Sequence, residues 1–221
     1  MAGERTFSRT KVLNQVGTYS GIELDGAVFE HCTLAQFDHP LETVVREASL
    51  VRCKATGKCF IHGVKFENVT VHDFAADDLV DFAACVFRNV TLEGVIGPFI
   101  TTRAHPSLGG ERRDEITRMM VDYYREVDWA LDISRGEFVD ATMPLVPGDL
   151  VRRNPETQFL VKREVLEAHP LEELPFIGKS YRRRFSTSPF DSLVIVAPTR
   201  SDKFSEIHAE LSEMRERGLA E

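Results

Sequence analysis

The fold is decided by residues 64–97, which read VKFENVTVHDFAADDLVDFAACVFRNVTLEGVIG. Two segments within this stretch, FENVT at 66–70 and FRNVT at 87–91, lie 21 residues apart. Between and around them, apolar residues recur at every fifth or sixth position. Repetition at a fixed period is the signature of an architecture in which similar units stack on one another.

The same period extends over most of the first hundred residues. Written in lines of 21 residues, the chain falls into four apolar columns, which predicts three faces of 5 residues and one of 6 in each coil. Stacked coils would bury these side chains by placing like residues about 4.8 Å apart and pairing their backbones. The columns are Leu24, Val45, Phe66 and Phe87; Phe29, Leu50, Val71 and Leu92; Leu34, Ala55, Ala76 and Gly97; and Tyr19, Pro40, Ile61 and Phe82.

Charged and turn-forming residues support the same register. The position after the first centre alternates in charge, and opposite charges on neighbouring rungs stabilise an outward ladder. The position after that is the predicted corner, where Gly and Asn tolerate a left-handed backbone. The ladder is Asp25, Arg46, Glu67 and Arg88, and the corner is Gly26, Glu47, Asn68 and Asn89.

With these columns, the chain resembles the pentapeptide-repeat family over residues 12–100. The resemblance implies a short right-handed quadrilateral β-helix of about four 21-residue coils. Each coil is one residue longer than is usual in that family, and two centres, Ala55 and Gly97, are small. The alternative fold is a β-sandwich, since sandwiches also contain short strands with alternating apolar residues.

All four cysteines fall on inward columns, so we expect them to be buried packing residues. Cys32 and Cys53 would be neighbours on adjacent coils, where a disulfide is geometrically possible but is disfavoured in a reducing cytoplasm. No Cys-x-x-Cys pair suggests zinc, and we predict neither a metal nor a cofactor. The seven histidines show no ligand spacing, and we expect them at the surface or at corners. The cysteines are Cys32, Cys53, Cys59 and Cys85.

Composition argues against several classes of protein. The 221 residues carry a net charge of -8, which argues against general nucleic-acid binding. No apolar signal segment follows the polar N-terminus, and the most apolar run, 193–198, is too short to cross a bilayer. We therefore expect a cytoplasmic protein that contacts neither a membrane nor nucleic acid.

After residue 100 the five-residue period is lost. A stretch rich in Pro and Gly, 101–110, is a predicted linker. Residues 111–221 then form a predicted α+β domain with an N-terminal helix at 111–131 and a C-terminal helix at 202–217, where apolar residues follow helical spacing. We expect the first helix to cap the open end of the β-helix, because exposed strand edges invite aggregation. Strands are expected at 137–143, 149–153, 157–163 and 192–197.

No catalytic motif is recognisable, which favours a non-catalytic role. Residues 12–100 contain twelve Asp and Glu against six Lys and Arg, and such a charge steers association with a complementary partner. We therefore predict an acidic protein-interaction module. The family resemblance implies a toxin or a type II topoisomerase as partner, although four coils span only about 19 Å, short for imitating a DNA duplex. The candidate contacts are Asp73, Asp77, Asp78 and Asp81.

Two alternatives remain open. Arginine binds oxyanions through paired N–H groups, so 111–221 is alternatively a small-anion, phosphate-ligand or enzymatic domain on a β-helix scaffold. The simpler interpretation of these arginines is a solvated face. The second alternative is a structural protein that forms a homodimer through the helix at 202–217. The candidate anion-binding residues are Arg152, Arg153, Arg182, Arg183 and Arg184.

Overall fold

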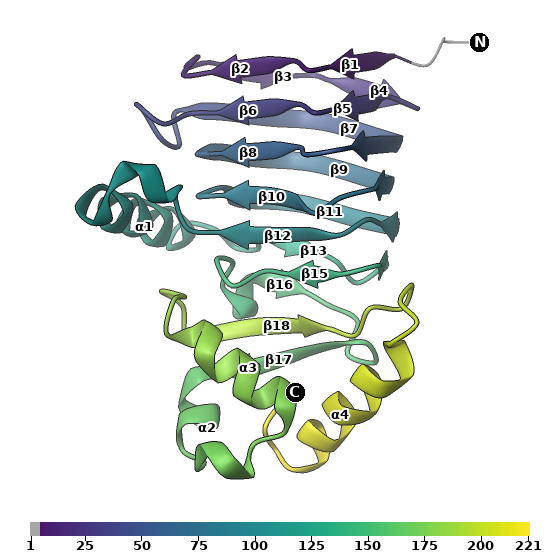
Figure 1. Cartoon of the computed structure of the whole chain (residues 1–221), viewed down its shortest axis with the longest axis vertical. Coiled ribbons are helices and arrows are strands. Elements are labelled where there is room, and N and C mark those ends of the chain that lie inside the picture. The colour runs from purple at the N-terminus through teal and green to yellow at the C-terminus, as the bar shows by residue number, and fades with distance from the viewer. Residues whose placement is uncertain (1–4) are drawn as a thin grey trace.

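The computed structural model describes residues 5–221, which form a mainly β protein with four α-helices among those residues (Figure 1). Twelve strands precede the first helix, and most of them are short because each ends at a corner of the chain path. They are β1 (Thr6–Ser8), β2 (Lys11–Leu13), β3 (Thr18–Ser20), β4 (Glu23–Asp25), β5 (Val28–Glu30), β6 (Thr33–Ala35), β7 (Thr43–Thr56), β8 (Phe60–His62), β9 (Val64–Ala76), β10 (Val80–Ala83), β11 (Val86–Ile96) and β12 (Phe99–Thr102).

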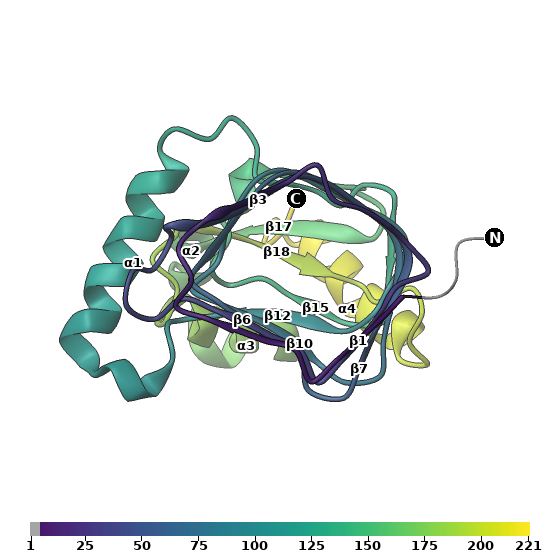
Figure 2. The same ribbon diagram turned by 90° about the horizontal axis from the view of Figure 1, so that it is seen from above.

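These strands belong to two parallel sheets that the chain visits in turn. One sheet contains β1-β5-β7-β9-β11, with β3 and β4 beside β7, and the other contains β2-β6-β8-β10-β12. Seen from above, successive circuits of the chain lie over a common outline (Figure 2), and we call each circuit a coil. Inward side chains stack from coil to coil, and the rings of Phe66 and Phe87 have centroids 5.7 Å apart.

The predicted 21-residue register is confirmed from β7 to β9 and, as far as Glu93, from β9 to β11. Beyond Glu93 it is wrong by one residue, because Ile96 and not Val95 pairs with Phe74, so Gly97 is not the partner of Ala76. Val45 pairs with Phe66, which pairs with Phe87. The corner residues Asn68 and Asn89 have φ of 55° and 54°, as the turn chemistry predicts, and the side-chain amide of Asn89 donates to that of Asn68 at 2.9 Å. Regular stacking in this part of the chain therefore follows from the sequence pattern.

The predicted register is wrong for the coil that precedes β7. Leu24 pairs with Leu50, a step of 26 residues, whereas the columns place Leu24 beside Val45. Leu34 likewise pairs with Ile61, so Pro40 is not part of that column. Every centre of this coil is displaced by one five-residue face.

The displacement changes the neighbours of the cysteines. Because Thr33 pairs with Phe60, Cys32 lies opposite Cys59 and not opposite Cys53. All four cysteines are free, and three are buried while Cys32 is half-buried. Burial raises the pKa of the Cys85 thiol to about 12, as expected for a packing residue.

The displacement is caused by segment 36–42, which leaves the stack after β6 and returns at β7. The Gln36 N–H donates to the His62 carbonyl and the Leu41 N–H donates to the Gly63 carbonyl, both at 2.8 Å. These two bonds fasten the ends of an extra loop to the next coil. A five-residue period hides such an insertion, because its length is close to that of one face.

The second half of the chain adds short strands and helices to this stack. The strands β13, β14 and β15 pair in parallel with β11 or β12, and β16 pairs in parallel with β13. Parallel pairing thus continues past residue 100, and one hydrophobic core includes residues from Leu41 to Val196. The elements are α1 (Gly110–Tyr124), β13 (Leu131–Asp132), β14 (Gly136–Phe138), β15 (Ala141–Thr142), β16 (Val151–Arg152), β17 (Gln158–Lys162), α2 (Arg163–Glu167), α3 (Phe176–Phe185), β18 (Ser192–Val196) and α4 (Phe204–Glu216), with 3-10 turns at Pro106–Leu108, Gly148–Leu150 and Leu171–Glu173.

The first helix differs from its prediction in length and in place. It ends at Tyr124 because the following chain joins the sheet, where the Ala130 N–H donates to the Leu150 carbonyl at 2.8 Å and Leu131 pairs with Val90. Figures 1 and 2 show α1 beside the stack and not across its end. The Tyr124 hydroxyl fixes it there by accepting from the Phe87 N–H at 3.2 Å.

The end of the stack is covered instead by the C-terminal elements. β18 pairs antiparallel with both β15 and β17, and α2, α3 and α4 pack on the far side of this pair around a second core (Figure 1). The apolar side chains of α4, such as Leu211 and Met214, point into that core. In residues 5–221, no helix is long and apolar enough to span a membrane.

Candidate functional site

An open groove of about 850 Å³ crosses several coils on the outside of the stack. It follows the corner after β4 and the equivalent corners in β7, β9 and β11, and we call it the corner groove. Charged residues form its rim and small apolar residues form its floor. Its lining is Asp25, Gly26, Val28, Arg52, Cys53, Lys54, Asp73, Ala75 and Val95.

A column of left-handed corners shapes this groove. Arg52 and Asp73 have φ of 50° and 54°, and Gly26 and Gly94 have φ of 68° and 69°. The Asp73 carboxylate accepts from the Val95 N–H at 2.8 Å and so joins two coils. A Cβ on Gly94 would approach that carboxylate to 2.2 Å, which explains why this corner carries glycine.

Acidic and basic side chains form ion pairs along the rim of the groove. Arg52 pairs with Asp25, and Lys54 pairs with Asp77 at 3.0 Å. All four side chains are more than two-fifths exposed, and exposed pairs of this kind contribute only about 0–1 kcal/mol. A partner can therefore replace them at little energetic cost.

His72 extends the rim to the next coil. Its Nε2 lies 3.3 Å from an Asp73 oxygen and its Nδ1 lies 3.8 Å from a Glu93 oxygen, and Glu93 also pairs with Arg135. The predicted histidine pattern had given His72 no role. Acidic and basic side chains thus alternate from coil to coil at this corner, and the groove is neither uniformly acidic nor uniformly basic.

The floor offers apolar contact in an extended strip. Val28 pairs with Lys54, which pairs with Ala75, so Val28 and Ala75 lie on the same outward row. Ala75 is exposed, and Val28 and Val95 are half-buried. Such a floor accepts side chains of an extended segment, while the rim fixes its direction.

The four predicted aspartates do not form one cluster. Asp73 lines the corner groove and Asp77 is tied to it through Lys54. The Asp78 carboxylate accepts from the Leu79 N–H at 2.8 Å. Asp81 belongs to the other sheet in β10, where it accepts from the Thr102 hydroxyl at 2.6 Å and burial raises the pKa of its carboxyl. Only Asp73 and Asp77 therefore belong to the candidate site.

The predicted arginines also lie in two separate places. Arg152, in β16, lies over the Trp129 ring at 4.2 Å, and Arg153, directly after this strand, is 4.0 Å from Glu221. Arg182 to Arg184 occupy the last turn of α3, where positive charge stabilises the helix carbonyl end. The structure thus explains most of these arginines without a ligand.

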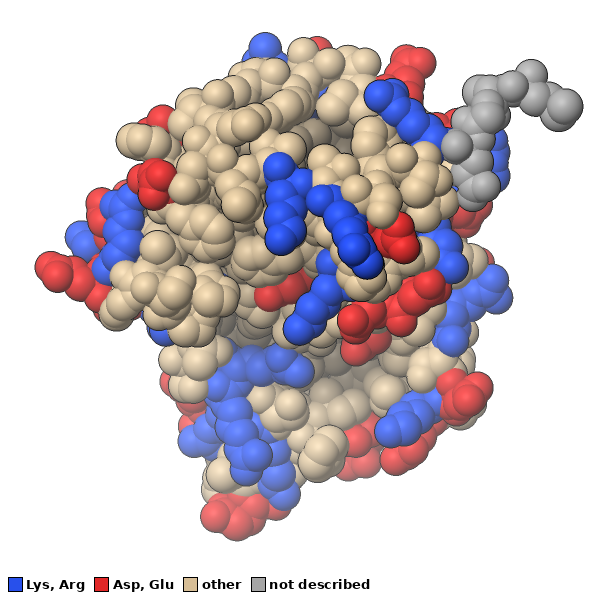
Figure 3. Space-filling model, turned by 45° about the horizontal axis from the view of Figure 1, so that its top comes forward, with Lys and Arg blue, Asp and Glu red and all other residues tan. Residues whose placement is uncertain are grey.

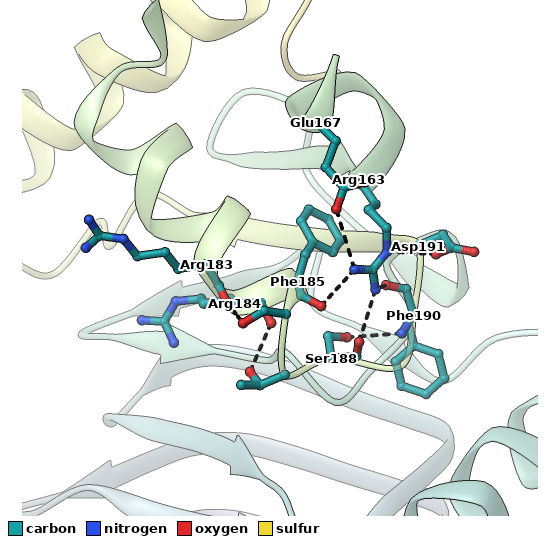
Figure 4. A network of polar contacts seen from close by, with 10 residues as sticks. Arg163, Glu167, Arg183, Arg184, Phe185, Ser188, Phe190 and Asp191 are labelled. Atoms are coloured by element: carbon teal, nitrogen blue, oxygen red, sulfur yellow. Dashed lines mark hydrogen bonds and ion pairs between the residues drawn. The ribbon is translucent and has the colours of Figure 1, made fainter. Parts of the chain in front are cut away.

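Contacts of the α3 arginines are local. Arg182 donates to the His169 carbonyl at 2.6 Å, and Arg184 lies over the Tyr181 ring at 5.5 Å. Figure 4 shows the guanidinium groups of Arg183 and Arg184 directed away from the neighbouring polar network. Arg183 itself is exposed.

The centre of that network is Arg163, which the sequence pattern did not single out. Its guanidinium donates to the carbonyls of Phe185, Ser188 and Phe190 at 2.8–3.0 Å and to the Asp191 carboxylate at 2.9 Å (Figure 4). It therefore fixes the chain between α3 and β18. A single Arg at the start of a helix gives no sequence signal for such a role.

His62 is the second residue that was missed, because histidines were expected at the surface or at corners. It is fully buried, and its ring stacks on Phe37 at a centroid distance of 4.4 Å. Its Nε2 accepts from the His105 N–H at 3.2 Å, which leaves Nδ1 to donate to the Gln36 carbonyl at 3.0 Å. Burial lowers the pKa of this imidazole.

Across residues 5–221, no group of three or more His, Cys, Asp or Glu is placed to hold a metal ion. On the face shown in Figure 3, acidic and basic side chains are interspersed. No family model, no curated protein and no solved structure matches this chain.

Proposed function

We propose that the parallel stack is a right-handed β-helix of pentapeptide-repeat type, and that the protein is a non-catalytic module whose corner groove binds a segment of a protein partner. The regular step from Val45 to Phe66 to Phe87 and the left-handed corners support the first part. The open corner groove, with its charged rim and apolar floor, supports the proposal that the protein binds a segment of a partner.

The groove suits a peptide segment better than a small molecule. Its apolar floor is shallow and open, so it cannot enclose a ligand on most sides as small-molecule pockets do. Its rim places acids and bases within reach of an extended chain. The acidic balance of residues 12–100 would steer a basic partner toward this surface.

The two partner classes implied by the family resemblance, a toxin and a type II topoisomerase, are both compatible with such a surface. The proposed compartment is the cytoplasm. Four free cysteines support that location, because thiols persist in reducing compartments.

The alternatives have less support. An anion-binding or enzymatic domain would need its arginines to converge, but Arg152 and Arg184 stack on different aromatic rings. A homodimer through the C-terminal helix would need a free apolar face on α4. The apolar residues Leu211 and Met214 of that helix are buried in the second core.

Affinity capture from native lysate at low and moderate salt tests the proposal, with mass spectrometry of the retained proteins. Two variants of the same strand provide the comparison. Ala75→Arg fills the exposed floor of the groove, and Thr70→Arg places the same side chain on an exposed neighbouring face of β9. We expect a partner that is retained at low salt, weakened by salt and lost only with Ala75→Arg.

Either of two results would contradict the proposal. One is a wild-type protein that retains nothing at either salt concentration. The other is a partner that both variants retain equally, which would place binding outside the groove. Circular dichroism of both variants verifies that they fold.

A further inference from the structure

Among residues 5–221, no element covers the N-terminal end of the stack, whose outermost strands form a rim. Its four strands, β1 to β4, complete one coil, and within the described residues each pairs with another strand on one side only. The opposite end of the stack is covered by β17, β18 and three helices (Figure 1). We call residues 5–26 the N-terminal rim.

Apolar side chains are exposed along this rim. The inward centres Phe7, Val12, Tyr19 and Leu24 are half-buried, and within the described residues each has a stacked neighbour on one side only. Leu13 is 48% exposed. Unpaired N–H and C=O groups together with open apolar centres form a surface that pairs readily with another strand edge.

Charge divides the rim into two halves. Residues 5–17, which contain β1 and β2, carry Arg5, Arg9 and Lys11 and no acid. Residues 18–26, which contain β3 and β4, carry Glu23 and Asp25 and no base. In Figures 1 and 2 the first pair of strands lies on one side of the rim and the second pair on the other.

We propose that the rim docks against the rim of a second copy, head to head, in a two-fold symmetric dimer. A two-fold axis through the corner between β2 and β3 places β2 over β3 of the second copy and β1 over β4 of the second copy. The strands then run antiparallel, and each basic half meets an acidic half. Isologous contacts of this kind are the usual way in which homodimers close.

The symmetry fixes a register that can be tested. Phe7 lies opposite Leu24 of the second copy and Val12 lies opposite Tyr19 of the second copy, so the numbers of opposed residues add to 31. Ser8 accordingly faces Glu23 of the second copy. Arg9 is one position further on and lies beside the same carboxylate.

A charge exchange distinguishes this dimer from any other. Arg9→Glu places acid against acid at both symmetric contacts, and Glu23→Arg places base against base. The double variant Arg9→Glu/Glu23→Arg restores attraction. Glu is compatible with the left-handed corner at position 9 (φ 50°), because Glu47 adopts φ 52° at an equivalent corner. Arg46→Glu, an exposed change in β7, the strand that pairs with β3 on the side away from the proposed interface, is the matched control.

Light scattering and sedimentation of the full chain over a concentration series measure the result. We expect a mass of twice 25.0 kDa for the wild type and for Arg46→Glu. Each single rim variant should raise the dissociation constant of the dimer about tenfold or more, and the double variant should restore dimer formation. A monomeric wild type, or single variants that dimerise like the wild type, would overturn the proposal.

Cysteine crosslinking tests the register even where a variant changes stability. The Ser8→Cys/Glu23→Cys protein should form a covalent dimer on mild oxidation, and Ser8→Cys/Thr18→Cys, whose numbers do not add to 31, should not. Equal crosslinking of both proteins would rule out the proposed register. The native thiols contribute little background because three of the four are buried.

Discussion

Acidification is expected to destabilise the protein through His62. The ring of this residue is fully buried, its Nδ1 donates to the Gln36 carbonyl and its Nε2 accepts from the His105 N–H. A proton on Nε2 would oppose that N–H and place a charge in a site without a counter-ion in direct contact. Asp81, an acid of the adjacent strand β10, already accepts a hydrogen bond from the Thr102 hydroxyl.

The direction of the pKa shift sets the pH range over which stability is lost, and proton linkage limits how steep the loss can be. Burial lowers the folded-state pKa of His62 below its ordinary 6.5, so the unfolded chain binds the proton more tightly than the folded protein does. The stability contributed by neutral His62 is fully present above pH 6.5 and is lost as the pH falls from there toward the folded-state pKa. One group of this kind changes the free energy of unfolding by at most about 1.4 kcal/mol per pH unit.

Urea denaturation between about pH 8 and pH 5 measures this loss. The His62→Gln variant is the reference, since its amide can donate and accept hydrogen bonds but cannot titrate. We expect it to be less stable than the wild type near pH 8 and to lose less stability on acidification. If both proteins lose the same free energy between pH 6.5 and pH 5, the reasoning about His62 is refuted.

Three further changes have defined outcomes. Arg163→Ala should lower the free energy of unfolding by about 3 kcal/mol in urea, because it leaves the carbonyls of Phe185, Ser188 and Phe190 without their donor; an effect below about 0.5 kcal/mol would contradict the network. Gly97→Ala should lower the melting temperature, since its Cβ would lie 2.5 Å from a backbone nitrogen, whereas Gly110→Ala, with nothing within 4 Å, should not. Alkylation near neutral pH should label half-buried Cys32 before Cys85, whose thiol has a pKa of about 12; mass spectrometry that finds equal labelling would show that Cys85 is accessible.

The periodic part of the fold was predictable from the sequence, and its interruption was not. The step from Phe66 to Phe87 is visible because inward and outward positions alternate with a constant length. Segment 36–42 adds almost the length of one face. Apolar residues therefore still fall at every fifth or sixth position, but the residues of β3 to β6 pair with different residues of β7 or β8 than the columns predict. Leu24 therefore seemed to belong beside Val45 when it pairs with Leu50.

The second half illustrates a different limit. Helical spacing predicted the start of α1, but the end of that helix depends on the pairing of Leu131 with Val90, a tertiary contact. Helix α3 was missed, although Tyr181 and Phe185 lie four residues apart on its buried face. Its three consecutive arginines obscured that pattern.

The candidate site was predictable only in part. Acidic residues on the outward positions suggested a partner surface, and Asp73 does line the corner groove. The apolar floor consists of Val28, Ala75 and Val95, which belong to three different coils. Their proximity can therefore be predicted only from the correct register. An error of one face in the predicted register is therefore enough to prevent the prediction of this surface from the sequence.

Photo-crosslinking in native cells tests the central claim most directly. A photoreactive residue at Ala75, on the exposed floor of the groove, is compared with the same residue at Thr70 on the adjacent face of β9. The proposed function predicts a discrete protein adduct at position 75 that is absent at position 70. No adduct at position 75, or the same adducts at both positions, would contradict the claim that the corner groove binds a protein partner.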